Sequence, residues 1–150
     1  MTIANSYNFR EITPTLTSSG VVGANRLKGL AEEGYECVIN LLPDDSDYAV
    51  GNEQATVEAQ GLQYIYIPVD WNKPTLENFH STIAALEENS AIKTHIHCAA
   101  NWRVSGFYSG YALSKALWTE AQAKAHIQDL WQPTDFPQWQ ALLSELGLKF

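Results

Sequence analysis

The sequence predicts an α/β fold in which helices flank a largely parallel central sheet. Short apolar runs alternate with longer segments of helical periodicity along the 150 residues. Apolar runs of this kind are typical of strands buried on both faces, and parallel strands need helical connections between them. No repeat, low-complexity tract or linker divides the chain. We therefore expect a single domain over residues 1–150.

Three apolar runs are the predicted strands. They are "ECVINLL" at 36–42, "LQYIYIPV" at 62–69 and "KTHIHC" at 93–98. Each is rich in strand-forming residues and apolar on both faces, so we expect all three in the middle of the sheet. Ligands of such sheets bind at the carboxyl ends of the strands. Cys98 stands at one of these ends.

Helical patterns fill the rest of the chain. Segment 104–118 is apolar almost all round, which predicts a central, buried helix. We expect Gly34 to end one helix, Asn52 to cap the start of another, and Thr119 with Gln122 to form a capping box. The predicted helices cover 25–34, 52–61, 74–89, 104–118 and 119–131, with a last amphipathic helix after Pro137.

The charge of the chain restricts its partners. The formal net charge is −8 and there is no basic run, so neither nucleic acid nor an acidic membrane surface is an expected partner. There is no signal-peptide pattern and no apolar run that could insert into a bilayer, which predicts a cytoplasmic protein. No feature of the sequence predicts an oligomeric state. An anionic ligand would need a local cation, which makes Arg10, Arg26 and Arg103 candidates.

The cysteines and histidines do not form a metal motif. The two cysteines, Cys37 and Cys98, are expected to be thiols in a reducing compartment, and neither belongs to a CxxC pair. His95 and His97 lie on one side of a predicted strand, with no carboxylate beside them in the sequence. We therefore expect neither a metal ion nor another cofactor.

The stretch "HCAANWRVS" predicts a reactive site. A strand that ends in Cys98, turns tightly and enters a helix directs backbone N–H groups and a helix N-terminus at one point, which attracts anions. The same field stabilises a thiolate, which is a nucleophile toward phosphorus or sulfur. Arg103 can bind two oxygens of a phosphoryl group through its planar guanidinium. We expect His97 to orient the loop by hydrogen-bonding the loop backbone, and Ser105 to offer a hydroxyl to the thiolate.

"HIHCAANWRVS" resembles the signature loop of the cysteine-dependent protein tyrosine and dual-specificity phosphatases, in particular the small bacterial dual-specificity-like group. The similarity extends upstream through "SSGVVGANRLKGLAEEGYECVINLLPDD" and "GLQYIYIPVDWNKPTLENF". The resemblance implies hydrolysis of phosphate monoesters through a phosphocysteine intermediate. It makes Cys98 the nucleophile, Arg103 the phosphate clamp and Asp70 the general acid. The implied substrate is a phosphorylated small molecule, a lipid headgroup or a phosphoprotein. The implied phosphate-binding loop consists of Ala99, Ala100, Asn101, Trp102 and Arg103.

Asp70 also has support from its position. It follows an apolar strand at the carboxyl edge of the predicted sheet, where it can face the same crevice as Cys98. A leaving alkoxide or phenoxide needs a proton in the transition state, which such a carboxyl group can supply. The alternative is that Asp70 fixes the turn before the next helix. Other acidic residues, Asp44, Asp45 and Asp47, follow a different predicted strand.

The loop departs from the phosphatase pattern in its length. The family places five residues between cysteine and arginine, whereas four separate Cys98 from Arg103. Either the loop is shorter and Arg103 still points inward, or Val104 occupies the position of the arginine. We expect Arg103 to point into the cradle and the helix to begin at or near it. Asn101 stands near the usual glycine, and asparagine tolerates a positive φ better than most residues.

Two other functions remain open. A cysteine, four residues and an arginine is also the pattern of the rhodanese sulfurtransferases, whose cysteine carries a persulfide. Against this, no aspartate-x-arginine follows the first core strand. A protein that binds a phosphorylated ligand, with little or no turnover, would use the same cradle. The sequence favours the phosphatase first, the binder or weak enzyme second and the sulfurtransferase third.

Overall fold

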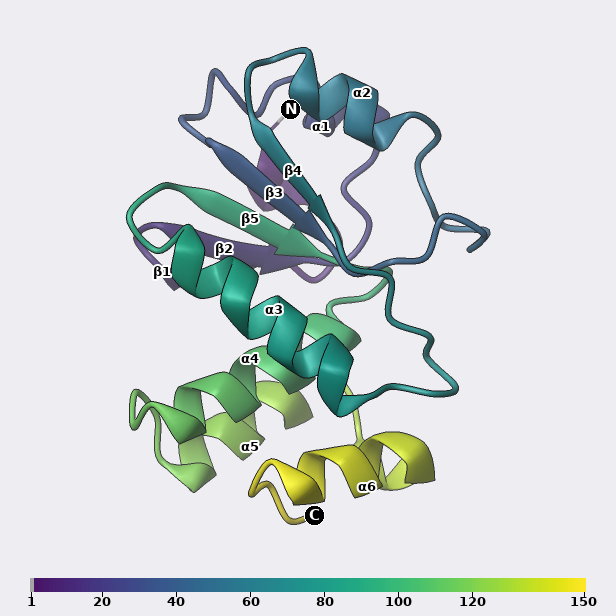
Figure 1. The fold of residues 1–150 in the computed structure, drawn as a ribbon, viewed down its shortest axis with the longest axis vertical. Coiled ribbons are helices and arrows are strands. Elements are labelled where there is room, and N and C mark those ends of the chain that lie inside the picture. The colour runs from purple at the N-terminus through teal and green to yellow at the C-terminus, as the bar shows by residue number, and fades with distance from the viewer. Residues whose placement is uncertain (1) are drawn as a thin grey trace.

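The computed structural model describes residues 2–150 and has a five-stranded sheet at its centre (Figure 1). The strand order is β1-β2-β5-β3-β4, in which β1 is antiparallel to β2 and the other neighbours are parallel. This mostly parallel α/β arrangement confirms the predicted fold class. The strands are β1 (Arg10–Thr13), β2 (Leu16–Ser19), β3 (Cys37–Asn40), β4 (Gln63–Tyr66) and β5 (Thr94–His97).

Helices cover both faces of the sheet. In Figure 1, α1 and α2 lie on one side, and α3, α4, α5 and α6 lie on the other. No helix within residues 2–150 has the length and apolar character needed to cross a membrane. The α-helices are α1 (Ala24–Leu27), α2 (Glu53–Glu58), α3 (Leu76–Glu88), α4 (Trp102–Ser114), α5 (Glu120–Gln128) and α6 (Pro137–Glu145), and the 3-10 helices are Ile3–Asn5 and Pro133–Asp135.

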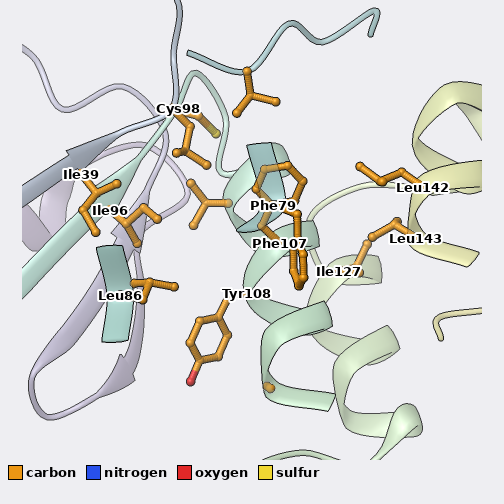
Figure 2. Packing of buried hydrophobic residues seen from close by; sticks show 14 of the residues in the cluster. Ile39, Phe79, Leu86, Ile96, Cys98, Phe107, Tyr108, Ile127, Leu142 and Leu143 are labelled. Carbon is orange, nitrogen blue, oxygen red and sulfur yellow. The ribbon is translucent and has the colours of Figure 1, made fainter. Parts of the chain in front are cut away.

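The two faces of the sheet belong to two hydrophobic clusters. The larger one joins Ile39 and Ile96 of the sheet to side chains of α3–α6, such as Phe107 (Figure 2). The smaller one joins Val38 to α1 and α2, through Leu27 and other residues. Every residue of β3 and β5 is buried, as their apolar runs predict. These two strands therefore give the site at their carboxyl ends a rigid base.

The edges of the sheet differ from the prediction. β4 is an edge strand with exposed ends rather than a central one, and the phenolic groups of Tyr64 and Tyr66 contact polar groups. The hairpin of β1 and β2 was not predicted, because "REIT" and "LTSS" are polar. Thr17 and Ser19 are nevertheless buried, since their hydroxyls hydrogen-bond the ring of His95.

The helix boundaries agree with the sequence in part. Thr119 and Gln122 form the predicted capping box, and α4 is the buried helix expected after the loop. The helix before Gly34 ends early, at Leu27, and turns continue to Gly34, where φ is 88°. Asn52 does not cap α2 with its side chain, because its φ of 59° lies outside the extended region that capping requires.

Candidate active site

Cys98 follows the central strand β5 and begins a tight loop. Asn101 is the N-cap of α4, so the helix begins at Trp102 and Arg103 is its second residue. The start of the helix is thus one residue before Arg103, near the expected position. Cys98 has no exposed surface and belongs to the larger hydrophobic cluster, at the strand end (Figure 2). The Cys98 N–H donates to the carbonyl oxygen of Ser19, at 3.3 Å, which ties the loop to β2.

The backbone of the loop is oriented as an anion cradle requires. The Ala99 carbonyl accepts from the Val21 N–H at 3.0 Å, and the Ala100 carbonyl accepts from Asn8 Nδ2 at 2.9 Å. Ala100 pairs with Gly20 in an isolated antiparallel β-bridge, and within residues 2–150 no other hydrogen bond has a backbone N–H of residues 99–103 as its donor. Two carbonyls are therefore held by the surrounding protein, while the loop N–H groups outside the bridge remain available to an anion.

Asn101 holds the turn in its left-handed conformation. Its φ is 67°, which asparagine adopts more readily than most residues. The side chain is fully buried, and Nδ2 donates to the Asn8 carbonyl at 2.9 Å and to Ser18 Oγ at 3.1 Å. Asn8 and Asn101 thus bind each other's loops reciprocally. These contacts hold the backbone of Asn101 in its left-handed conformation.

Two residues that support the loop were missed by the sequence analysis, namely Asn8 and Gly20. A Cβ atom on Gly20 would overlap with the Ala99 carbonyl, so only glycine allows β2 to approach the loop this closely. Gly20 gave no signal in the sequence, because the strand that it follows was itself not predicted. Asn8 has a φ of 54°, but nothing in the sequence connects it to a loop more than 90 residues away.

Arg103 faces the loop that contains Asp70. Its Nε donates to the Val69 carbonyl at 2.8 Å, and its guanidinium carbon lies 5.4 Å from the centre of the Trp71 ring. Val104, by contrast, is only 1% exposed and packs in the larger hydrophobic cluster. Of the two residues that could correspond to the family's arginine position, only Arg103 faces the crevice.

The crevice beside the loop has two lobes, and Arg103, Trp71 and Ser46 line both. The apolar lobe, of about 750 Å³, also contains the loop residues Ala99 and Ala100. Tyr7 and Tyr48 stand at this lobe with 60% and 67% of their surface exposed, unusually high for such large side chains. The acidic lobe, of about 430 Å³, is lined further by Pro43, Asp45, Pro68, Asp70 and Asn72.

Asp70 lies in the acidic lobe together with Arg103, and its side chain is exposed. Its Oδ1 also accepts a hydrogen bond from the Asn72 N–H at 2.9 Å, so Asp70 fixes a turn as well as facing the crevice. Asp45 lies in the same lobe and is a competing acid. Asp44 lines neither lobe but a separate hollow beside Tyr64 and Tyr66.

The Asp70 loop is anchored to α6, a feature that the sequence did not indicate. The Trp71 carbonyl accepts from Trp139 Nε1 at 2.9 Å and from Gln138 Nε2 at 3.2 Å. The Trp71 ring stacks on Trp139 and packs against Trp102 at the start of α4. The aromatic residues therefore connect the loop of Asp70 to the helix of Arg103.

Ser105 and His97 make different contacts from those expected. Ser105 Oγ donates to the Trp102 carbonyl and accepts from Trp131 Nε1, and no hydrogen bond within residues 2–150 joins it to Cys98. His97 Nε2 bonds Glu53 at 2.5 Å, while its Nδ1 has no partner and thus does not hold the loop backbone. Alternation along β5 explains this, because successive side chains point to opposite faces of the sheet. Nowhere in residues 2–150 do three metal-ligating side chains form a group.

Comparison with known families identifies the class of this domain. Residues 8–125 match the family model described as "Beta-lactamase hydrolase-like protein, phosphatase-like domain". The match covers most of the chain and includes the Cys98 loop and Asp70. The chain therefore belongs to this phosphatase-like family. No curated protein is significantly similar to it.

Solved structures agree with this assignment. A DUF442 protein from Shewanella putrefaciens CN-32 is 32% identical, with a TM-score of 0.85, over 99% of this chain and 97% of that one. Tk-PTP has a TM-score of 0.74 at 18% identity, over 93% and 95% of the two chains. TpbA from P. aeruginosa, in complex with phosphotyrosine, has a TM-score of 0.71 at 17% identity, over 93% and 87%. The fold is thus that of the protein tyrosine and dual-specificity phosphatases.

Proposed function

We propose that this protein is a cysteine-dependent phosphatase that hydrolyses phosphate monoesters through a phosphocysteine intermediate. The observation that supports this most strongly is the run of backbone N–H groups at residues 99–103 that the fold leaves largely unbonded, directly after Cys98 and beside Arg103. Such a cradle stabilises the equatorial oxygens of a transferring phosphoryl group. It also counteracts locally the net charge of −8, which would otherwise repel the substrate.

The proposed reaction has two steps. The Cys98 thiolate attacks phosphorus, the phosphorus–oxygen bond to the leaving group breaks, and Asp70 gives its proton to the departing oxygen. A water molecule then attacks the phosphocysteine, the sulfur–phosphorus bond breaks, and Asp70 accepts a proton from that water. Arg103 binds two phosphoryl oxygens throughout. Cysteine and aspartic acid are thereby regenerated and inorganic phosphate is released.

The shape of the crevice indicates the kind of ester. The apolar lobe adjoins the loop and offers Tyr7, Tyr48 and Trp102 to the organic part of a substrate. The acidic lobe carries Asp45 and Asp70 and disfavours additional negative charge. Among phosphorylated small molecules, lipid headgroups and phosphoproteins, we therefore propose a monoester with an aromatic or apolar group beside the phosphate. The phosphotyrosine bound by TpbA, a protein of the same fold, is an ester of this kind.

The general-acid role of Asp70 is tested with two substrates. Asp70→Asn should slow hydrolysis of an alkyl phosphate by about 10²–10⁴-fold, because the alkoxide leaves only with a proton. The same variant should slow hydrolysis of 4-nitrophenyl phosphate much less, because that leaving group departs readily as an anion. Steady-state kcat values of the wild type and the variant on both esters make the measurement.

Asp45→Asn is the matched control, since Asp45 is exposed in the same lobe. It should leave the ratio of the two kcat values unchanged. If Asp70→Asn lowered kcat equally on both esters, Asp70 would have only a structural role, in the turn that it forms with Asn72. If only Asp45→Asn slowed the alkyl phosphate more than 4-nitrophenyl phosphate, Asp45 would be the general acid.

A binder of phosphorylated ligands, or a weak enzyme, is the second candidate. It is favoured by the complete burial of Cys98 and by a loop one residue shorter than that of the phosphatase family. Such a protein would bind inorganic phosphate or vanadate at the loop but release no phosphate from either ester. Turnover by the wild type that is lost without Cys98 excludes the pure binder.

A further inference from the structure

A buried pair of ionisable residues lies next to the nucleophile. His97, the last residue of β5, bonds Glu53 through Nε2 at 2.5 Å, and their side chains are only 3% and 5% exposed. Glu53 is the first residue of α2, on the face of the sheet opposite α4 (Figure 1). Burial of a carboxylate is unfavourable unless it is well paired, so this contact is tightly constrained. Because Cys98 follows His97 directly, the contact fixes the backbone where the loop begins.

Glu53 is the only hydrogen-bonding partner of the His97 ring within residues 2–150. Nδ1 of His97 is buried and has no partner. The ring stacks on His95, with 6.1 Å between their centres, and His95 is itself held by Thr17 and Ser19. If the bond to Glu53 were removed, no polar contact would determine the orientation of the His97 ring.

The surroundings of the pair contain few other ionisable groups. Burial lowers the pKa of His95 well below its usual range, with a smaller contribution from His97, so His95 remains neutral. Tyr64 of β4 faces Glu53, and burial raises its pKa, with further contributions from the charges of Glu53 and Asp44. Tyr64 therefore remains a neutral phenol. Glu53 is thus the ionisable group that contacts the His97 ring and can fix its orientation.

We propose that Glu53 is a positioning residue for Cys98, which acts by fixing the ring of His97 from the far side of the sheet. The inference rests on the proposed function in assigning reactivity to Cys98. Glu53 touches neither lobe of the crevice and lines a separate hollow, of about 540 Å³, with Tyr64 and Tyr66. Its effect on the reaction must therefore pass through His97.

The test measures the rate at which iodoacetate alkylates Cys98, followed by peptide mass spectrometry. Glu53→Ala should slow alkylation about tenfold, the scale on which loss of the partner that orients a functional histidine reduces activity. Glu53→Gln should remain within about threefold of the wild type, because its amide oxygen can still accept from Nε2. Glu58→Ala, at an exposed position of the same helix and hollow, should have no effect. The kcat for 4-nitrophenyl phosphate should follow the same order, with KM unchanged.

A double-mutant comparison shows whether Glu53 acts through His97. In a His97→Asn background, Glu53→Ala should cause no further loss, because coupled residues are not additive. Near-UV circular dichroism checks that each variant is folded. If Glu53→Ala is not folded, the alkylation rate of Glu53→Gln is compared with that of the wild type instead. The inference is overturned if the losses of alkylation rate from Glu53→Ala and His97→Asn are additive, or if Glu53→Ala is alkylated as fast as the wild type. It is also overturned if Glu53→Gln is alkylated as slowly as Glu53→Ala, or if Cys98 of the wild type is no more reactive than Cys37. Alkylation needs no phosphate ester, so failure of the proposed function would appear only in kcat.

Discussion

Cys98→Ser should reduce the hydrolysis of 4-nitrophenyl phosphate by at least about 10⁴-fold, the scale on which loss of a catalytic nucleophile reduces kcat. The serine hydroxyl fits the same space, but it is a far weaker nucleophile in the absence of an adjacent base. Cys98 directly follows β5 and begins the loop whose N–H groups form the proposed anion cradle. The hydroxyl would not gain from that field as a thiolate does. Steady-state kcat at saturating substrate measures the loss.

Cys37→Ala is the matched control for the thiol. Cys37 is equally buried, but it starts β3 and has no anion cradle beside it. Burial raises the pKa of its thiol to about 11, which makes it inert near neutral pH. We expect this variant to keep wild-type kcat once its fold is verified. If Cys98→Ser retained a tenth or more of the activity, the nucleophile would have to be sought elsewhere.

Arg103→Lys should reduce kcat/KM by about 10³-fold, near the lower end of the range for loss of an arginine that stabilises a transferring phosphoryl group. Lysine keeps the positive charge but not the planar guanidinium that binds two oxygens at once. It also loses the geometry in which Nε binds the Val69 carbonyl while the other nitrogens are available to the substrate. The vanadate dissociation constant should rise in parallel, because vanadate occupies the same cradle.

Arg26→Lys provides the control for Arg103. Arg26 also donates a hydrogen bond to a backbone carbonyl, that of Val22 at 3.1 Å, but it lies in α1 and lines neither lobe of the crevice. Its substitution should leave kcat/KM within about twofold, as expected for a site away from the chemistry. If the two lysine variants behaved alike, the short loop would lack an arginine clamp. The weak-binder alternative would then gain support.

The parts of the fold that follow from local pattern were predictable from the sequence. Apolar runs located β3 and β5, and the all-round apolar segment after Arg103 predicted α4. The position of the helix N-terminus near Arg103 followed from the small residues of the loop. Edge strands were less predictable, because β2 has polar residues whose burial depends on partners such as His95. Such partners are distant in the sequence.

The supports of the site show the same limit. Asn8, Gly20 and Glu53 contact the loop or its neighbour across separations of 44 to 93 residues. No local pattern distinguishes Glu53 from Glu58, the other acidic residue of α2. Asp70 was located by its place after a strand, but its proximity to Arg103 depends on the anchoring of Trp71 by α6. The chemistry of the loop was therefore apparent in the sequence, whereas the contacts that hold it were not.

The identity of the covalent intermediate tests the proposed phosphatase reaction most directly. The wild type is mixed rapidly with 4-nitrophenyl phosphate or with thiosulfate, denatured at once, and the peptide that contains Cys98 is weighed by mass spectrometry. We expect the mass of one phosphoryl group on Cys98 after the phosphate ester, and no added sulfur after thiosulfate. A persulfide sulfur on Cys98 after thiosulfate, with no phosphoryl group after the ester, would contradict the proposal and assign the four-residue loop to sulfur transfer.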